Sequence, residues 1–303
     1  MTHLALAATA ASTIGMLPGC GDDSASAPAD AMVAAAFYPL EYLAEQIGGD
    51  QVAVVALTRP GGGPHDLELT PDPLVTMYDT DLVVYLADFQ PALDAALGER
   101  SGPSGAVSTL ATRVATDDEH AEDEHADDEN SRSDPRFWND PTRFAAAGLV
   151  AEGLAAADPD NRDAYLANAE SLAVELTALD EEAEAALASC AIRTLVTAHD
   201  AFGYFADRYG FEVLSIAGIS PDTDPSASQL AAVTDAVRSA GVTTIYTETL
   251  VSAAIAQTVA DETGAATAVL DPLDGLTDES AGADYPSVMR ANVATVAQGQ
   301  ECE

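Results

Sequence analysis

The sequence predicts an α/β protein of two lobes, each with a parallel sheet flanked by helices, joined by one long rigid helix. Short apolar runs alternate with segments of helical spacing in both halves of the chain, and a largely helical stretch from Pro141 to Ala188 separates the halves. Such alternation favours parallel sheets with crossover connections. A chain of 303 residues, 48% of them hydrophobic, is long enough for two cores.

The N-terminal lobe is expected at residues 31–141. Its elements are expected at Met32–Phe37 (strand), Pro39–Ile47 (helix), Gln51–Leu57 (strand), a short helix ending at Tyr78, and Asp81–Ala87 (strand). Residues 116–134 interrupt this pattern with a run made almost wholly of Asp, Glu, His, Ala and Ser. A segment without apolar periodicity cannot bury a core, so we expect this loop to be disordered.

A helical linker is expected at 142–189 and a C-terminal α/β lobe at 190–303. Pro159 opens a second helix, and the stretch Asp160–Ala188 would run about 40 Å, which suits a strut between lobes. The C-terminal elements are expected at Arg193–Thr197, Phe211–Ile216, Thr243–Thr247 and Ala266–Leu270 (strands) and at Phe202–Arg208, Ser226–Ala240, Ser252–Thr263 and Tyr285–Ala297 (helices).

The charge balance is extreme, with 51 acidic residues against 11 basic ones, all of them arginine, and a net charge of −40. Nucleic-acid binding is excluded, because phosphate contacts need a basic face. The acid excess has two interpretations, which can coexist. It forms a solvated surface suited to high salt, or its field concentrates cations near the protein, although salt screens that field.

The N-terminus is typical of an exported protein. Residues 4–17 form an apolar, alanine-rich run that is too short to span a bilayer, so residues 1–20 are expected to be a signal peptide. Leu17-Pro18-Gly19-Cys20 resembles a bacterial lipobox, which predicts a lipid on Cys20 and residues 21–30 as a tether. The expected location is the outer face of the cytoplasmic membrane; a periplasmic or secreted protein is the alternative.

Two cysteines remain, Cys190 before a strand and Cys302 near the end of the chain. Disulfides persist in exported proteins, so we expect these two to form a bridge. A zinc site built from them is the less favoured alternative, because no other cysteine is left to help.

Three loops that follow expected strands carry metal-ligand chemistry: Pro64-His65-Asp66, the loop of His199, and Leu270-Asp271-Pro272. In parallel sheets, ligands bind outside the carboxyl ends of strands. Imidazole with carboxylate suits zinc, and to a lesser degree manganese or iron. The alternatives are a surface histidine at 65, a core histidine at 199 and a turn or helix cap at 271.

Taken in order, several motifs resemble the zinc- and manganese-binding receptors of bacterial ABC importers, the cluster A-I solute-binding proteins. The resemblance runs from about Met32 to Gln298 and covers Gly61–Thr70, Asp134–Pro141, the His199 loop, Ile216–Pro225, Tyr246–Ser252 and Leu270–Leu276. It implies two lobes with the metal in a cleft between them, and it matches three ligands with His65, His199 and Asp271. The implied role, which involves no enzymatic step, is that of a monomer that captures Zn²⁺, with Mn²⁺ as the alternative, and delivers it to a permease.

The fourth family ligand, a histidine, is replaced by Arg136, which stays protonated and cannot coordinate a cation. Three outcomes stay open: water completes the site, His120 or His125 of the acidic loop swings in, or the site has drifted towards weak metal binding or an anionic or chelated cargo. His120 and His125 are also candidates for an auxiliary zinc site. Glu248, at a strand end, is either a partner of a ligand histidine or a plain surface acid.

Rival functions come from other classes. Two histidines, a carboxylate and an open water position also describe a catalytic zinc site, but no His-Glu-x-x-His helix is present to support an exported metallohydrolase. A surface adhesin is a second rival, because some relatives combine adhesion with metal binding. A receptor of the same fold for another cargo is the third.

Overall fold

The computed structural model describes residues 29–59, 61–64, 67–87, 89–98, 108–109, 135–145, 148–218, 225–250 and 252–303. The proposed signal peptide, Cys20 and most of the tether lie outside these ranges, as does the acidic loop 116–134 with His120 and His125. His65 and Asp66 also lie outside them. Within the described ranges, no helix combines the length and the apolar character needed to cross a bilayer.

The N-terminal lobe is built on a four-stranded parallel sheet of order β2-β1-β3-β4. Its elements are β1 (Ala31–Ala35), α1 (Tyr38–Gly48), β2 (Val52–Ala56), α2 (Pro71–Asp79), β3 (Leu82–Tyr85), α3 (Pro91–Gly98) and β4 (Ser108–Thr109). β3 is buried along its whole length, as expected for an apolar strand inside a parallel sheet. The sequence prediction missed α3 and β4, because α3 is a single alanine-rich stretch and β4 has only two residues.

The C-terminal lobe repeats the same strand order with β6-β5-β7-β8, again all parallel. Its elements are β5 (Thr194–Thr197), α8 (Gly203–Tyr209), β6 (Glu212–Ser215), α9 (Ala227–Ala240), β7 (Thr244–Thr247), α10 (Ala254–Thr263), β8 (Ala266–Val269) and α11 (Tyr285–Gly299). The predicted strands and helices of this lobe each agree with an observed element to within about two residues. The α/β fold class with two parallel sheets is therefore confirmed.

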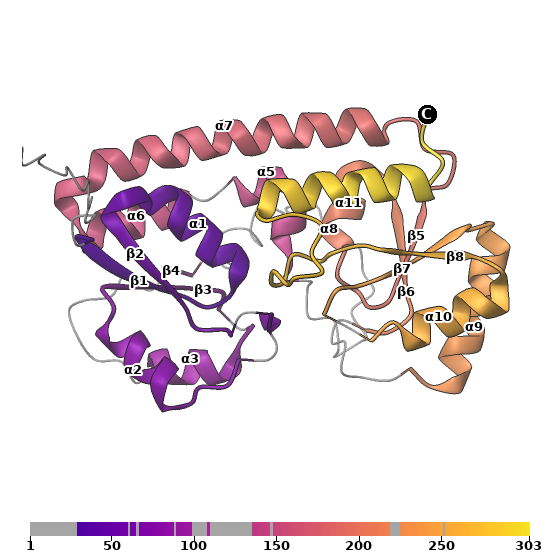
Figure 1. The fold of residues 1–303 in the computed structure, drawn as a ribbon, viewed down its shortest axis with the longest axis horizontal. Coiled ribbons are helices and arrows are strands. Elements are labelled where there is room, and N and C mark those ends of the chain that lie inside the picture. The colour runs from indigo at the N-terminus through magenta and orange to yellow at the C-terminus, as the bar shows by residue number, and fades with distance from the viewer. Residues whose placement is uncertain are drawn as a thin grey trace, which may run out of the picture.

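Helix α7 (Arg162–Leu187) joins the lobes and lies along one side of both (Figure 1). Before it come α5 (Pro141–Phe144), α6 (Gly148–Ala157) and a 3₁₀ turn at Pro159–Asn161, where a helix break was predicted. The buried residues of α7 repeat at helical spacing, with Leu172, Leu176 and Leu179 on one face. Each such leucine contributes about 1.5–3 kcal/mol on burial, so this face ties α7 to the lobes beneath it.

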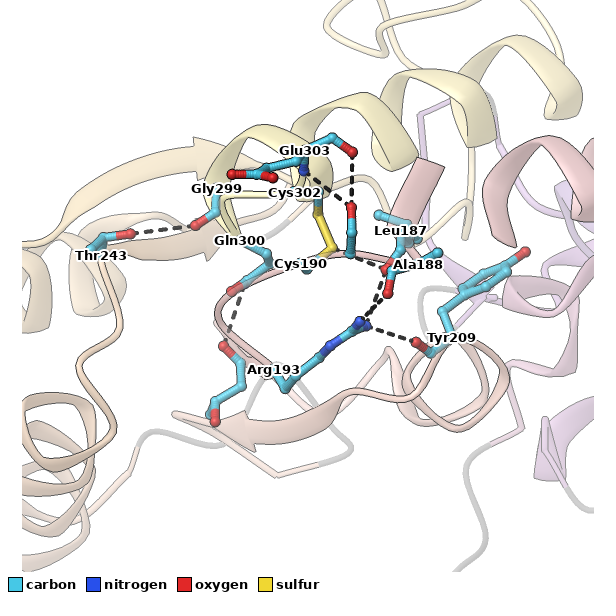
Figure 2. Close-up of a disulfide and its surroundings, with 12 residues drawn as sticks. Leu187, Ala188, Cys190, Arg193, Tyr209, Thr243, Gly299, Gln300, Cys302 and Glu303 are labelled. Carbon is cyan, nitrogen blue, oxygen red and sulfur yellow. Dashed lines mark hydrogen bonds between the residues drawn. A yellow bond between two sulfur atoms is a disulfide. The ribbon is translucent and has the colours of Figure 1, made fainter. Parts of the chain in front are cut away.

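The far end of α7 is fixed to the C-terminus of the chain. Cys190 and Cys302 form a disulfide, which confirms the predicted bridge (Figure 2). Arg193 donates hydrogen bonds to the carbonyls of Leu187 and Ala188 at the end of α7. A cation at a helix C-terminus satisfies unpaired carbonyls and interacts favourably with the helix dipole. The disulfide and these hydrogen bonds therefore hold together the segments at the amino ends of the strands of the C-terminal sheet, which we call the closed end.

Candidate metal site

The candidate site lies where loops leave the carboxyl ends of neighbouring strands in the C-terminal lobe. His199 follows β5 by two residues, and Glu248 directly follows β7. These two strands are paired, with Thr197 opposite Tyr246. Because β5 has β6 on one side and β7 on the other, the site sits at a switch in strand order, where α/β sheets bind ligands.

His199 is almost fully buried, and both of its ring nitrogens are in contact with charged side chains. Its Nδ1 lies 2.6 Å from Oε2 of Glu248, and its backbone N–H donates to Oε1 of the same carboxylate. Its Nε2 lies 3.0 Å from Nη2 of Arg136. A guanidinium can only donate, so Nε2 accepts and the ring proton of a neutral His199 belongs on Nδ1, facing Glu248.

Arg136 is completely buried at the centre of this group. Its Nε lies 3.2 Å from both carboxylate oxygens of Asp274, and its Nη1 donates to the backbone carbonyl of Asp200 at 3.4 Å. The structure thus places the guanidinium between the nitrogen of His199 and the carboxylate of Asp274, two groups that carry metal-ligand atoms.

Of the two aspartates in the loop after β8, Asp274 rather than Asp271 faces His199 through Arg136. The Asp271 carboxylate accepts from the backbone N–H of Leu273 and from Oγ of Ser280, so each of its oxygens has a partner within its own loop. Leu273, between the two aspartates, has φ 60°. A left-handed leucine is an unfavourable conformation held by its surroundings, and here it turns the chain from Asp271 to Asp274.

Residues 61–64, which precede His65 in the sequence, approach the loop after β8 from the N-terminal lobe. Gln90, which follows β3, donates from Nε2 to the carbonyl of Pro64 at 2.7 Å. Gly275 packs so closely that a Cβ on it would lie 2.7 Å from the carbonyl oxygen of Gly62. Residues 61–64 and the loop after Asp274 are therefore in direct contact.

Burial raises the pKa of the Glu248 carboxyl above its ordinary value, although the contact with His199 acts in the opposite direction. Burial also raises the pKa of Asp271, and the hydrogen bond from the Leu273 N–H partly offsets this. Both shifts follow from the cost of placing a charged carboxylate out of water. A cation held among these groups would offset that cost.

Among the residues that the structure describes, no three His, Cys, Asp or Glu side chains come together as a metal-binding group. The described chain contributes His199 and Asp274 to the site, with Arg136 between them. The sequence prediction named Asp271 for the site, and the structure brings the carboxylate of Asp274 to Arg136. The available signal was a second aspartate three residues on, in Asp271-Pro272-Leu273-Asp274, but spacing alone could not rank the two.

Two parallel-sheet lobes joined by one long helix, with buried polar groups where their loops meet, define the class of two-lobed solute-binding receptors. Within that class, the chain belongs to the family described as zinc-uptake complex component A, periplasmic, whose model matches residues 33–299. The resemblance predicted from the motifs is thus confirmed.

The curated relatives of the chain include two at 32% identity. One is the high-affinity zinc uptake system protein ZnuA of Bacillus subtilis (strain 168), aligned over 92% of both chains. The other is the zinc-binding protein AdcA of Streptococcus pyogenes serotype M3, aligned over 87% of this chain and 55% of the relative. The chain therefore spans about half the length of AdcA.

Solved structures show the same fold. The Zn(II)-bound ZnuA-like domain of Streptococcus pneumoniae AdcA matches with TM-score 0.74 and 28% identity, over 90% of this chain and 99% of that one. The laminin-binding protein Lmb of Streptococcus agalactiae, described as bifunctional with adhesin and metal transporting activity, matches with TM-score 0.75 and 29% identity, over 89% and 99%.

Proposed function

We propose that the protein is an extracytoplasmic receptor that captures zinc and delivers it to the permease of an ABC importer. The observation that carries this proposal is the setting of His199: its Nδ1 faces a buried carboxylate, while its Nε2 lies against Arg136, which in turn contacts Asp274. Metal-binding histidines use this arrangement, because a carboxylate on one nitrogen orients the ring and raises the basicity of the other.

The proposed ligands are His199, His65 and one carboxylate from the loop after β8. Asp274 is favoured over Asp271, because the oxygens of Asp271 are already hydrogen-bonded within their loop. Imidazole nitrogen favours zinc over manganese, which prefers oxygen-rich sites. His120 and His125 are proposed as a weak auxiliary site.

Export and anchoring belong to the same proposal. The apolar leader and Cys20 support a lipid-anchored monomer on the outer face of the cytoplasmic membrane, where it would meet its permease. The AdcA of Streptococcus pneumoniae serotype 4, 30% identical to this chain, is described as a zinc-binding lipoprotein. We assign no chemical step to the protein.

The test is a zinc titration of the purified metal-free protein against a competing chelator. We expect one zinc per chain, bound tightly by the native protein and lost in His199→Ala. The matched control is His120→Ala with His125→Ala, which removes two histidines outside the site and should leave the tight site intact. Binding that survives His199→Ala and disappears on deletion of residues 117–130 would contradict the proposal.

Adhesion is a second candidate, supported by the likeness to Lmb. It predicts binding to a laminin-coated surface that is unchanged by His199→Ala. Absence of laminin binding by the native protein would remove this candidate and leave the zinc proposal unaffected.

A further inference from the structure

The group that holds Asp274 and His199 together is a cation supplied by the chain itself. Arg136 contacts both oxygens of Asp274 and the Nε2 of His199. These are the atoms that a bound metal ion would use. The positive charge of the guanidinium therefore lies where the charge of a bound metal ion would lie.

Arg136 is positioned by the residues that follow it, which are hydrogen-bonded to the C-terminal lobe. Trp138 Nε1 donates to the carbonyl of Pro272, and Asn139 Nδ2 donates to the carbonyl of Ala201. Tyr285 donates to the carbonyl of Trp138. The backbone at Arg136 is thus held beside the site, while the side chain reaches the ligand atoms through rotatable bonds.

The hydrogen bonds of Arg136 argue against a role as a receptor for an anionic cargo. All three guanidinium nitrogens donate to protein atoms: Nε to Asp274, Nη1 to the Asp200 carbonyl and Nη2 to His199. A buried anion receptor would direct donors towards its ligand. These donors are instead directed at groups of the site itself.

A guanidinium and a divalent cation cannot share these partners. At a separation of 3–4 Å in a buried site, two positive charges repel strongly, and one lone pair on Nε2 cannot serve both. With neither cation present, the Asp274 carboxylate would be buried without a counter-charge, which is unfavourable. Each cation can therefore satisfy the site, but only one at a time.

We propose that Arg136 is a tethered competitor of the cargo cation. It holds Asp274 and His199 in place when metal is absent and must leave both when metal binds. This inference rests on the proposed zinc-receptor function, and it assigns to Arg136 the role of setting the zinc affinity of the receptor. Displacement of Arg136 lowers the affinity below that of the same ligands alone, and its return promotes release of the metal.

The experiment compares zinc affinity, by chelator competition, in the native protein and in Arg136→Gln, which keeps a neutral donor of similar reach. We expect Arg136→Gln to bind zinc at least about tenfold more tightly, in line with coupling energies of close buried charges. The metal-free variant should also melt at a lower temperature than the metal-free native protein. Arg136→His serves as a second variant if Arg136→Gln does not fold.

The matched control is Arg290→Gln, which removes the same charge from an exposed pair with Glu182 and should leave zinc affinity unchanged. A further readout is specific to competition: millimolar guanidinium ion should weaken zinc binding by Arg136→Ala but not by the native protein.

The outcomes separate this inference from the proposed function. Equal or weaker zinc binding by Arg136→Gln, beside His199-dependent binding by the native protein, overturns the inference alone. Binding by Arg136→His but not by the native protein supports the inference and overturns the zinc function of the native chain. Absence of zinc binding in both the native protein and Arg136→His overturns both the inference and the proposed zinc function.

Discussion

At the amino ends of its strands, the C-terminal sheet is closed by the Cys190–Cys302 disulfide, while at the carboxyl ends it holds the buried polar side chains of Arg136, His199 and Glu248. The end with the disulfide is held by a covalent bond and by hydrogen bonds to backbone oxygens. Thr243 Oγ1 donates to the carbonyl of Gly299 (Figure 2). Ser189 Oγ donates to the backbone oxygen of Glu303. The other end uses side chains whose partners can be exchanged.

This difference shows how one sheet can serve stability and binding separately. A disulfide and hydrogen bonds to backbone carbonyls stabilise only one arrangement. A neutral histidine and a carboxylate held by a guanidinium can accept another cation in its place. Changes at the closed end should therefore alter the free energy of unfolding, and changes at the charged end should alter metal affinity.

The largest effect is expected at the closed end. The disulfide spans 112 residues, and removal of a bridge that closes a loop of this length destabilises by about 4–5 kcal/mol. The double variant Cys190→Ser/Cys302→Ser should unfold at lower denaturant concentration, and native protein in reductant should match it. Zinc affinity of the folded variant should stay within about twofold of native; a larger loss would show that the two ends are coupled.

The next effect is expected at the charged end. His199→Ala removes a proposed ligand nitrogen and should weaken zinc binding by at least about a hundredfold, equivalent to about 2.7 kcal/mol. Chelator competition measures the affinity, and circular dichroism checks that the variant is folded. An unchanged dissociation constant would mean that His199 is only a buried structural histidine.

Glu248→Gln tests the orienting carboxylate without removing a ligand. Gln keeps a group beside the ring and the backbone N–H of His199 but lacks the charge, so zinc affinity should fall by about tenfold. The matched control is Glu212→Gln, an exposed residue of β6, which should have no effect. Equal zinc affinity of Glu248→Gln and Glu212→Gln would mean that the charge of Glu248 does not contribute to zinc binding.

The smallest effect is expected at Asp284, which caps α11, the helix that leads towards Cys302. Asp284→Ala should lower stability by about 1 kcal/mol at neutral pH. The Ser287 hydroxyl, together with the Ser287 backbone N–H, lowers the pKa of Asp284 in the folded state. Its contribution is therefore full above the unfolded pKa of about 4 and is lost as pH falls through the lower folded value.

The measurement is the difference in unfolding free energy between native protein and Asp284→Ala as a function of pH. This difference should shrink on acidification. Asp284→Asn, which can still cap the helix without a charge, should show little pH dependence relative to Asp284→Ala. A constant difference across pH would mean that the carboxylate charge contributes nothing to the cap.

The sequence predicted the elements that depend on local pattern. Apolar runs such as Thr243–Thr247 and the proline at 159 placed strands and a helix start correctly. The two-residue β4 could not be predicted, because its strand character comes only from pairing with β3. His199 was predicted as a metal ligand because it follows an expected strand, and the end of a strand can be predicted from the sequence pattern.

By itself, the sequence determined most of the order of strands and helices, the division into two sheets, the long helix and the cysteine pair. Hydrophobic periodicity is a local property of the chain, and only two cysteines are left to pair once Cys20 is set aside. Only the tertiary structure decided that Arg136 reaches across to His199 and Asp274, 63 and 138 residues away, and that Asp274 rather than Asp271 faces them. Those contacts depend on how separate loops dock, and docking is determined by the packing of the lobes and not by the local spacing of residues.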